Sequence, residues 1–178
     1  MPCPGDPRYL CGNGNRIAYY TWTGTPLSNW DFPTGPAAGE YRFYVPGVVI
    51  PLITSVAING KITFLEKHGT GAPNTTGAYE LDPSLVGNGP WEPAWREMTV
   101  KTDVFCAAGL TLPDKAGRQI NIGGWANDDT KGVRLYTPDG SPGTPGVNNW
   151  QEDVQTISLQ QGRWYPTGKL PLAAPKLH

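Results

Sequence analysis

The sequence predicts an all-β protein with two similar four-stranded units behind a loop-rich N-terminal tail. Three observations support this fold class. Apolar and polar residues alternate with the period of two that half-buried strands show. The 23 glycines and 19 prolines among 178 residues indicate frequent turns. Seven Trp, eight Tyr and four Phe supply more aromatic surface than an unfolded chain carries, and the length is enough for one buried core.

The charge balance and the apolar stretches argue against several partners. Fourteen Lys and Arg face fifteen Asp and Glu, so the net charge is −1, and there is no basic run to bind nucleic acid or an anionic membrane. The apolar residues 48–53 are interrupted by Pro51 and fall far short of the roughly 20 residues of a membrane span. Residues 1–6 lack the basic start and apolar core of a secretory signal peptide.

Residues 1–22 form the N-terminal tail, which contains two of the three cysteines and few apolar residues. Such a segment needs a covalent link, because it has little surface to bury. Its motifs Cys3-Pro4-Gly5, Cys11-Gly12-Asn13-Gly14 and Asn15-Arg16 resemble the closing part of a WSC domain, a disulfide-built module of fungal cell-surface and secreted proteins. The resemblance implies a remnant of that module, an extracellular location and a glycan partner. A chance cysteine pair in a loose leader is the alternative.

The main domain is expected over residues 41–178, after a Gly/Pro linker at residues 23–40. Its first unit contains Asn59-Gly60, which is the strongest two-residue hairpin signal, between two alternating segments. The four strands expected in this unit lie at residues 52–58, 61–66, 78–81 and 95–101.

A second unit repeats the plan of the first. Its strands are expected at residues 105–110, 118–124, 133–136 and 154–159. Equivalent residues keep a nearly constant spacing: 57 positions from Lys61 to Arg118 and from Tyr79 to Tyr136, and 55 from Trp95 to Trp150. We therefore expect two copies of one structural unit.

The repeat has the features of kelch β-propeller blades, which are four-stranded, recur at about 50 residues and carry a Gly-Gly doublet, a Tyr and a Trp. The second unit has this order in Gly123-Gly124, Tyr136 and Trp150, whereas the first has Lys67-His68-Gly69 in place of the doublet. The pattern predicts a partial kelch-type propeller of about two blades and the first strand of a third. Since propellers have at least four blades, the ring stays open, and its free strand edges favour self-association.

No standard catalytic constellation is present. The two histidines, His68 in a predicted turn and His178, do not form a nucleophile–base arrangement with any other residue of the sequence. The three cysteines do not have the spacing of zinc ligands. The pairs Asp128-Asp129 and Glu152-Asp153 are expected on solvated loops and edges, because neighbours on a strand point to opposite faces.

Residues 103–109 and 161–167 are expected on the first strands of successive blades, next to the propeller axis. Together with residues 117–125 and 133–136, these segments resemble the N-terminal part of the fungal glyoxal oxidases. Those enzymes are secreted copper radical oxidases related to galactose oxidase. The resemblance covers about residues 41–170 and depends on Phe-Cys-Ala and Arg-Trp-Tyr-Pro motifs on either side of the Gly-Gly doublet.

The resemblance implies a catalytic role for Cys106 and Tyr165. In the family, a thioether joins this cysteine to this tyrosine, and the tyrosine is both a copper ligand and the radical site. The implied reaction oxidises aldehydes to carboxylic acids and reduces O₂ to H₂O₂. The family's second tyrosine and two histidine ligands have no counterpart here, so we expect the chain alone to be inactive. Trp164 either shields the radical or packs between blades, and packing is the favoured interpretation.

Simpler interpretations exist for the same residues. Cys106 can be a buried strand cysteine, and Tyr165 a core aromatic residue whose hydroxyl is hydrogen-bonded. The alternative function is a non-catalytic WSC and kelch fragment that binds glycans or a protein partner, or that self-associates through open sheet edges. The sequence does not decide the substrate or the oligomeric state.

Overall fold

The computed structural model describes residues 9–12, 15–18, 35, 38–39, 43–67 and 77–169. The chain divides into two compact units, residues 1–43 and 44–178. The described residues form β-strands and short 3-10 helices without an α-helix, so the predicted all-β class is confirmed. None of the described helices has the length and apolar character needed to cross a membrane.

The first unit contains a two-stranded antiparallel hairpin in the tail that was predicted to be rich in loops. Strands β1 (Tyr9–Gly12) and β2 (Asn15–Ala18) pair so that Cys11 lies opposite Arg16. Cys3 lies outside the described residues.

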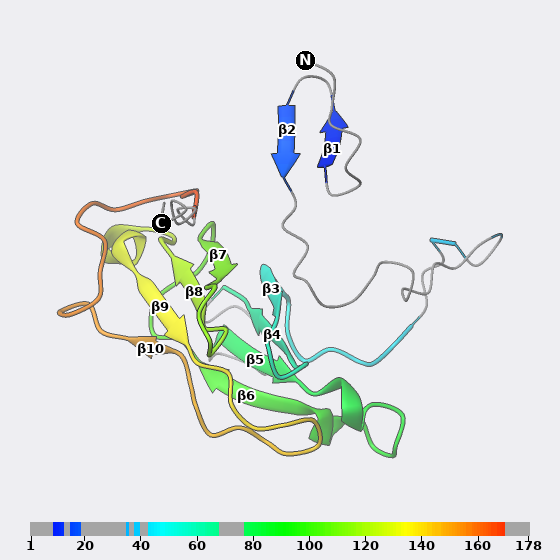
Figure 1. Ribbon diagram of the computed structural model, residues 1–178. Coiled ribbons are helices and arrows are strands. Elements are labelled where there is room, and N and C mark those ends of the chain that lie inside the picture. Colours follow the sequence, from blue (N-terminus) through cyan, green and yellow to red (C-terminus); the bar gives the residue numbers. More distant parts are fainter. Residues whose placement is uncertain are drawn as a thin grey trace. The chain divides into compact units, whose positions relative to one another are not determined.

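Sheet 1 of the second unit is a four-stranded antiparallel meander (Figure 1). It consists of β3 (Ile53–Val56), β4 (Ile62–Leu65), β5 (Gly77–Leu81) and β6 (Trp95–Thr99), in that spatial order. The hairpin predicted at Asn59-Gly60 joins β3 and β4, with Gly60 N–H donating to the Ala57 carbonyl at 3.0 Å. Gly60 takes the left-handed conformation (φ 81°) that closes such a loop.

Sheet 2 repeats this order with β7 (Ala108–Thr111), β8 (Gln119–Ile122), β9 (Val133–Tyr136) and β10 (Gln151–Glu152). The predicted fourth strand at residues 154–159 is wrong. Asp153 accepts hydrogen bonds from the Gln155 N–H at 2.9 Å and the Thr156 hydroxyl at 2.6 Å, which form a turn instead. The strand therefore ends at Glu152.

The strand predicted at residues 161–167 is also absent. The Gly124 N–H donates to the Arg163 carbonyl at 3.2 Å, and the Tyr165 N–H donates to the Cys106 carbonyl at 3.1 Å. These backbone groups bond to loops and not to a neighbouring strand, and Tyr165 has a φ of 54°, which interrupts an extended chain.

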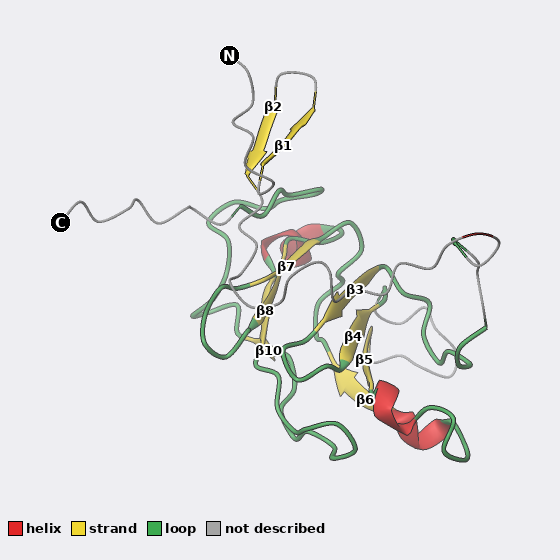
Figure 2. Ribbon diagram, turned by 45° about the vertical axis from the view of Figure 1, so that its right-hand side comes forward, coloured by secondary structure: helices red, strands yellow, loops and turns green. Residues whose placement is uncertain are grey.

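The two sheets pack against each other, with β3 beside β7 (Figure 1, Figure 2). Their apolar core consists of Leu65, Ala78, Met98, Val100, Val104, Tyr136 and Trp150. The long connection from β9 to β10 lies along β6, where Arg96 donates to the Asn148 carbonyl at 2.7 Å. Within the described residues the two sheets do not close into a ring.

Part of the interface between the sheets is polar. Thr63 of sheet 1 donates to the Gln119 side chain of sheet 2 at 2.6 Å, and the Tyr136 hydroxyl donates to Glu80 at 2.7 Å. Both bonds are buried, so a shift of one sheet along the other would leave these groups unpaired. The polar pairs therefore fix how the sheets align.

Candidate functional site

Cys106 lies in a tight turn and not on a strand, which corrects its predicted placement. The Ala107 N–H donates to the Val104 carbonyl at 2.9 Å, and Cys106 occupies the third position of this turn with a φ of 65°. A left-handed residue at this position is usually glycine or asparagine. β7 begins only at Ala108, because the turn interrupts the extended chain before it.

Tyr165 meets Cys106 although the two residues are 59 positions apart. The Tyr165 N–H donates to the Cys106 carbonyl at 3.1 Å, so the two loops are joined through their backbones at this point. The neighbouring Cys106 side chain, acting first by hydrogen bonding and then electrostatically, raises the pKa of the Tyr165 phenol, and burial adds to this shift. Tyr165 is 70% exposed, so it is not the core residue of the simpler interpretation. The contact is geometric, and the catalytic role of both residues stays a prediction.

The Gly-Gly doublet makes room for both loops. A Cβ atom on Gly123 would lie 2.7 Å from the Arg163 carbonyl oxygen and 2.9 Å from Pro166. A Cβ atom on Gly124 would overlap the carbonyl oxygen of Asp103. Only glycine permits this approach, so the doublet allows the Cys106 and Tyr165 segments to lie against the end of β8.

Left-handed backbone conformations gather at this site. Among the described residues, the non-glycine positions with positive φ are Cys106, Tyr165, Ala126 and Asn127. The last two lie at the start of η5 (Asn127–Lys131), directly after the doublet and Trp125. Such conformations cost free energy and cluster at functional sites. The two residues singled out from the sequence are thus two of the four strained ones.

A row of aromatic rings extends from Tyr165. Tyr165 stacks on Trp164 with 5.2 Å between ring centroids and 24° between planes. Trp164 contacts Trp125 at 5.1 Å, and Trp125 contacts Phe105 at 5.7 Å. Trp164 is 56% exposed, so it is not packed between the sheets as the favoured interpretation held.

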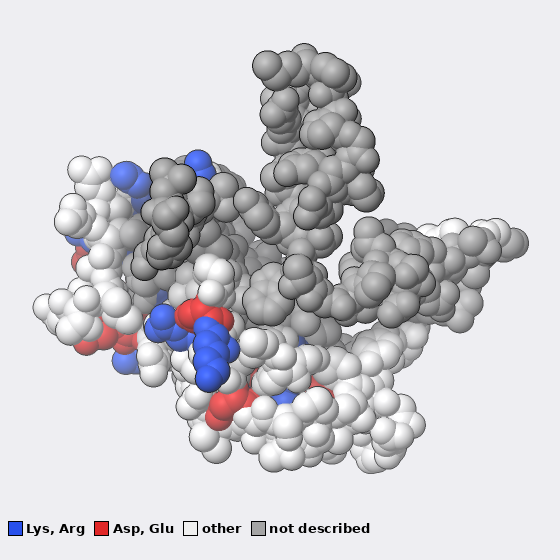
Figure 3. Space-filling view, in the orientation of Figure 1, with Lys and Arg blue, Asp and Glu red and all other residues white. Residues whose placement is uncertain are grey.

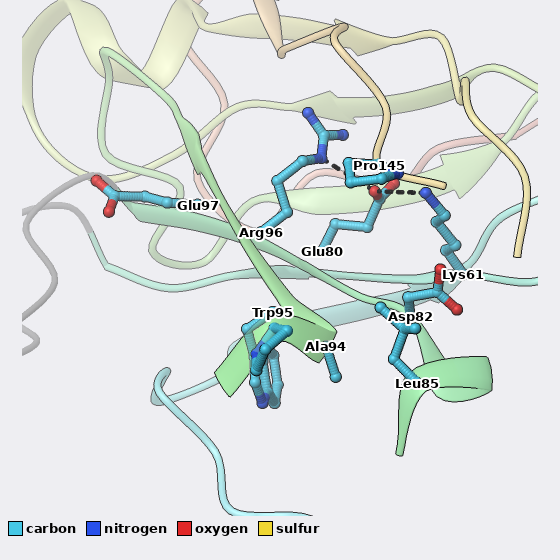
Figure 4. Close-up of a pocket in the computed structure, with 10 residues that line it drawn as sticks. Lys61, Glu80, Asp82, Leu85, Ala94, Trp95, Arg96, Glu97 and Pro145 are labelled. Atoms are coloured by element: carbon cyan, nitrogen blue, oxygen red, sulfur yellow. Dashed lines mark hydrogen bonds and ion pairs between the residues drawn. The ribbon is translucent and has the colours of Figure 1, made fainter. Parts of the chain in front are cut away.

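The described residues also surround a cavity of about 310 Å³ beside Lys61, at the start of β4 (Figure 4). Its charged groups already bind each other. Lys61 and Arg96 lie 3.5 and 3.1 Å from a Glu80 carboxylate oxygen, and Asp82 accepts hydrogen bonds from Ser84 and Gly143. These side chains hold the sheets together, so the cavity is not our candidate site.

The described residues do not bring together three His, Cys, Asp or Glu side chains that could hold a metal ion. His68 and His178 lie outside the described residues. Cu(II) prefers a tetragonal set of nitrogen and oxygen ligands, whereas the Cys106–Tyr165 pair offers one phenol oxygen and one sulfur. The described part of the chain thus fits only part of a copper site. On the face shown in Figure 3, acidic and basic side chains lie beside one another.

The comparisons with known proteins identify two relatives. The chain is 60% identical to a WSC domain-containing protein of Arthroderma benhamiae over 165 residues, or 93% of this chain. It is 33% identical over 75 residues, or 42% of this chain, to the aldehyde oxidase GLOX of Vitis pseudoreticulata. The chain spans 18% and 13% of the lengths of these proteins. No family model matches the sequence. No solved structure matches it either.

The two similarities differ in coverage. An alignment of 165 residues within 178 must include both sheets, so the resemblance to the WSC domain-containing protein extends well beyond the tail. An alignment of 75 residues is shorter than the span from Ile53 to Glu152 and cannot include both sheets completely. The WSC resemblance is therefore supported more strongly than the glyoxal oxidase resemblance.

Proposed function

We propose that this chain supplies the cysteine–tyrosine pair of a copper radical oxidase of the glyoxal oxidase type. The overall reaction converts an aldehyde, O₂ and water to a carboxylic acid and H₂O₂. The observation that carries the proposal is the backbone hydrogen bond of 3.1 Å between the Tyr165 N–H and the Cys106 carbonyl, and the raised pKa of the Tyr165 phenol agrees with a neighbouring Cys106 side chain. Each residue holds a left-handed conformation in a loop at this contact. The resemblance to a protein named aldehyde oxidase supports the same reaction class.

The chemistry requires such a pair. Copper exchanges one electron at a time, so a two-electron oxidation needs a second one-electron store. A phenol with a thioether substituent is easier to oxidise than an unmodified tyrosine. The protein's part is to hold the two side chains together and orient them.

The other copper ligands would come from outside the described residues. We expect copper(II) added to the 178-residue chain to be removed by EDTA without any change in the melting temperature, because one phenol and one sulfur do not complete a site. Calorimetric melts with and without chelator measure this. A copper-dependent rise in melting temperature would contradict the expectation.

The stacking of the sheets supports two neighbouring blades of a kelch propeller. The face of sheet 2 that contacts sheet 1 contains Tyr136, whereas the equivalent Tyr79 lies on the face of sheet 1 that points away from sheet 2. The sheets thus stack in the same direction, like successive members of a series. Such head-to-tail contacts generate rings when the rotation closes. The resemblance of the tail to a WSC domain favours a secreted protein, because disulfide-built modules occur in extracellular proteins.

Oxidative crosslinking tests the central contact. Treatment with hexachloroiridate(IV) should break the Cys106 S–H bond and a ring C–H bond of Tyr165, form one S–C bond, release two protons and pass two electrons to two oxidant ions. Peptide mass spectrometry should show the joined peptides with two hydrogens fewer. Tyr165→Phe should abolish the product, and Tyr44→Phe should not. A fully alkylatable Cys106 after oxidation would refute the proposal.

A second candidate, binding of a glycan, is favoured by the exposure of Trp125, Trp164 and Tyr165. Exposed aromatic faces offer apolar surface next to polar edges. Titration with soluble β-glucan and chitin oligosaccharides, followed through tryptophan fluorescence, tests it. A saturable change lost in Trp164→Ala but kept in Trp91→Ala would favour this candidate.

A further inference from the structure

We propose that Asp103, held by Lys67, is the positioning residue that fixes the Cys106 turn against Tyr165. The inference rests on the proposed function only for the chemistry that follows from the contact. The positioning itself depends on hydrogen bonds and an ion pair between described residues.

The Asp103 side chain supports the turn from within. Its Oδ1 accepts the Phe105 N–H at 2.9 Å, which fixes the residue directly before Cys106. This is the local bond by which aspartate stabilises a turn two residues ahead. Since Cys106 has an unfavourable φ of 65°, the surrounding bonds must hold it there.

The Asp103 backbone is hydrogen-bonded to residues that follow the Gly123-Gly124 doublet in the chain. Its N–H donates to Asp129 Oδ2 at 3.0 Å. Its carbonyl accepts from the Trp125 N–H at 3.3 Å and from Arg134 Nη2 at 3.3 Å. Asp103 is therefore fixed by its own backbone and can orient the residues that follow it.

Lys67 connects this residue to the other sheet. It lies two positions beyond β4, and its ammonium group forms an ion pair with Asp103 Oδ2. The same group lies 5.9 Å from the Phe105 ring centroid, within the range of a cation–π contact. Lys67, which follows β4 of sheet 1, thus contacts two residues next to Cys106, namely Asp103 and Phe105.

The turn is held from both sides. Asp103 fixes its entry, and the Tyr165 N–H binds the Cys106 carbonyl at its far side. Loss of the Asp103 carboxylate would free Cys106 to return to a favourable conformation. The sulfur would then leave the Tyr165 ring, although the fold could persist.

Variants of the 178-residue chain separate these effects. Asp103→Ala removes both carboxylate bonds, Asp103→Asn keeps an oxygen for Phe105 but loses the charge, and Lys67→Met removes the ammonium group. The matched control is Asp114→Ala, because Asp114 accepts a backbone N–H of Arg118 at 3.1 Å and pairs with its guanidinium at 2.7 Å. Two readouts are used: the nuclear Overhauser effect between Cys106 β protons and Tyr165 ring protons, and the yield of the oxidative crosslink.

We expect the Overhauser effect to disappear in Asp103→Ala and the crosslink yield of this variant to fall at least tenfold. The crosslink yield should fall about two- to fivefold in Asp103→Asn and Lys67→Met, and both readouts of Asp114→Ala should match the wild type. Wild-type readouts in Asp103→Ala overturn the proposal. If that variant does not fold, wild-type readouts in both milder variants overturn it.

The outcomes also separate the two proposals. If the Overhauser effect follows this series but the wild type itself forms no crosslink, the positioning stands and the proposed function fails. If the wild type and Asp103→Ala form the crosslink equally well, the positioning fails and the proposed function stands.

Discussion

Two equivalent tyrosine–tryptophan pairs lie in different surroundings in the two sheets. In sheet 1 the ring centroids of Tyr79 and Trp95 are 6.2 Å apart, and Trp95 Nε1 donates to the Pro46 carbonyl at 3.0 Å. In sheet 2 the centroids of Tyr136 and Trp150 are 5.5 Å apart. The first pair contacts the segment before β3, whereas the second is buried in the core between the sheets.

The difference teaches that a repeat specifies a residue's place on a strand but not what covers it. Burial and the hydrogen bond to Glu80 both raise the pKa of Tyr136 far above its usual value. The pKa of Tyr79 is also raised, by burial and then by Glu97 and Glu66. The neighbour of each sheet, and not its own sequence, decides which hydroxyl takes part in the interface.

The residues that follow the equivalent strands β4 and β8 also make different contacts. After β4, the buried Glu66 side chain accepts the Ile50 N–H at 2.9 Å. After β8, the backbone of Gly124 itself contacts the Arg163 carbonyl. The absence of a side chain lets the crossing segment approach closely, and this approach is what places Tyr165 beside Cys106.

The largest expected effect comes from Arg134, whose equivalent in sheet 1 is Gly77. Arg134 is fully buried and donates to Glu152 at 3.0 Å and to Asn121 at 2.8 Å. Burial lowers its pKa, while Glu152 opposes that shift. Arg134→Met should cost about 3–5 kcal/mol in unfolding free energy, because Glu152 stays buried without its partner.

Urea denaturation measures this cost, and Arg118→Met is the control. The Arg118–Asp114 pair is partly exposed, so its loss should cost less than about 1 kcal/mol. Equal costs for the two variants would show that the buried arginine is not what distinguishes sheet 2.

The next effect concerns the doublet. Gly124→Ala should cost about 3 kcal/mol, because the new methyl group would overlap the Asp103 carbonyl and lie 2.9 Å from the Asp129 carbonyl oxygen. Gly87→Ala tests backbone strain alone, since Gly87 has a φ of 86° and no atom within 4 Å of the new Cβ; about 1 kcal/mol is expected. A Gly124→Ala cost no greater than that of Gly87→Ala, in the same denaturation assay, would remove the case for close approach.

A smaller effect separates the two tyrosines. Tyr136→Phe removes the hydroxyl that donates to Glu80 at 2.7 Å and accepts from Arg96 at 3.0 Å, so it should cost about 1–3 kcal/mol. Tyr79→Phe should cost less than about 0.5 kcal/mol, because the other sheet does not pack against its hydroxyl. Thermal melts of both variants measure the difference, and the reverse order would contradict our assignment of the inner face.

The smallest effect is a dependence on pH. Burial raises the pKa of Asp82, but hydrogen bonds from Ser84 and Gly143 outweigh it and leave the pKa below its usual value. The unfolded value is about 3.9, so the stabilisation is complete above about pH 4 and is lost as the pH falls through the lower folded value. Asp82→Asn should flatten this acid limb in melts between pH 2 and 6, with Asp128→Asn as the exposed control. An unchanged limb would mean that other carboxylates control it.

The sequence predicted the regular part of the fold well. The period of two and the spacing of 57 residues placed seven of the eight strands of sheets 1 and 2 close to their observed positions. The tail was harder to predict, although Asn13-Gly14 between β1 and β2 is itself a hairpin signal.

Two of the strand predictions that failed share one physical cause. Residues 154–159 alternate like a strand, but Asp153 forms local hydrogen bonds that compete with the sheet. Asp103 acts in the same way before Cys106. An aspartate whose side chain can accept the backbone N–H two residues ahead was the available signal at both places. The roles of Lys67 and Trp125 could not be predicted, because they depend on contacts between distant segments.

The carboxylate of Glu80 couples the two sheets. It receives Arg96 and Lys61 from its own sheet and Tyr136 from the next. A replacement of Glu80 would leave Lys61, Arg96 and Tyr136 without this acceptor, so a change in sheet 1 would also affect a hydroxyl of sheet 2. The effects of substitutions at Glu80 and Tyr136 are therefore expected not to add, although the two residues belong to different sheets.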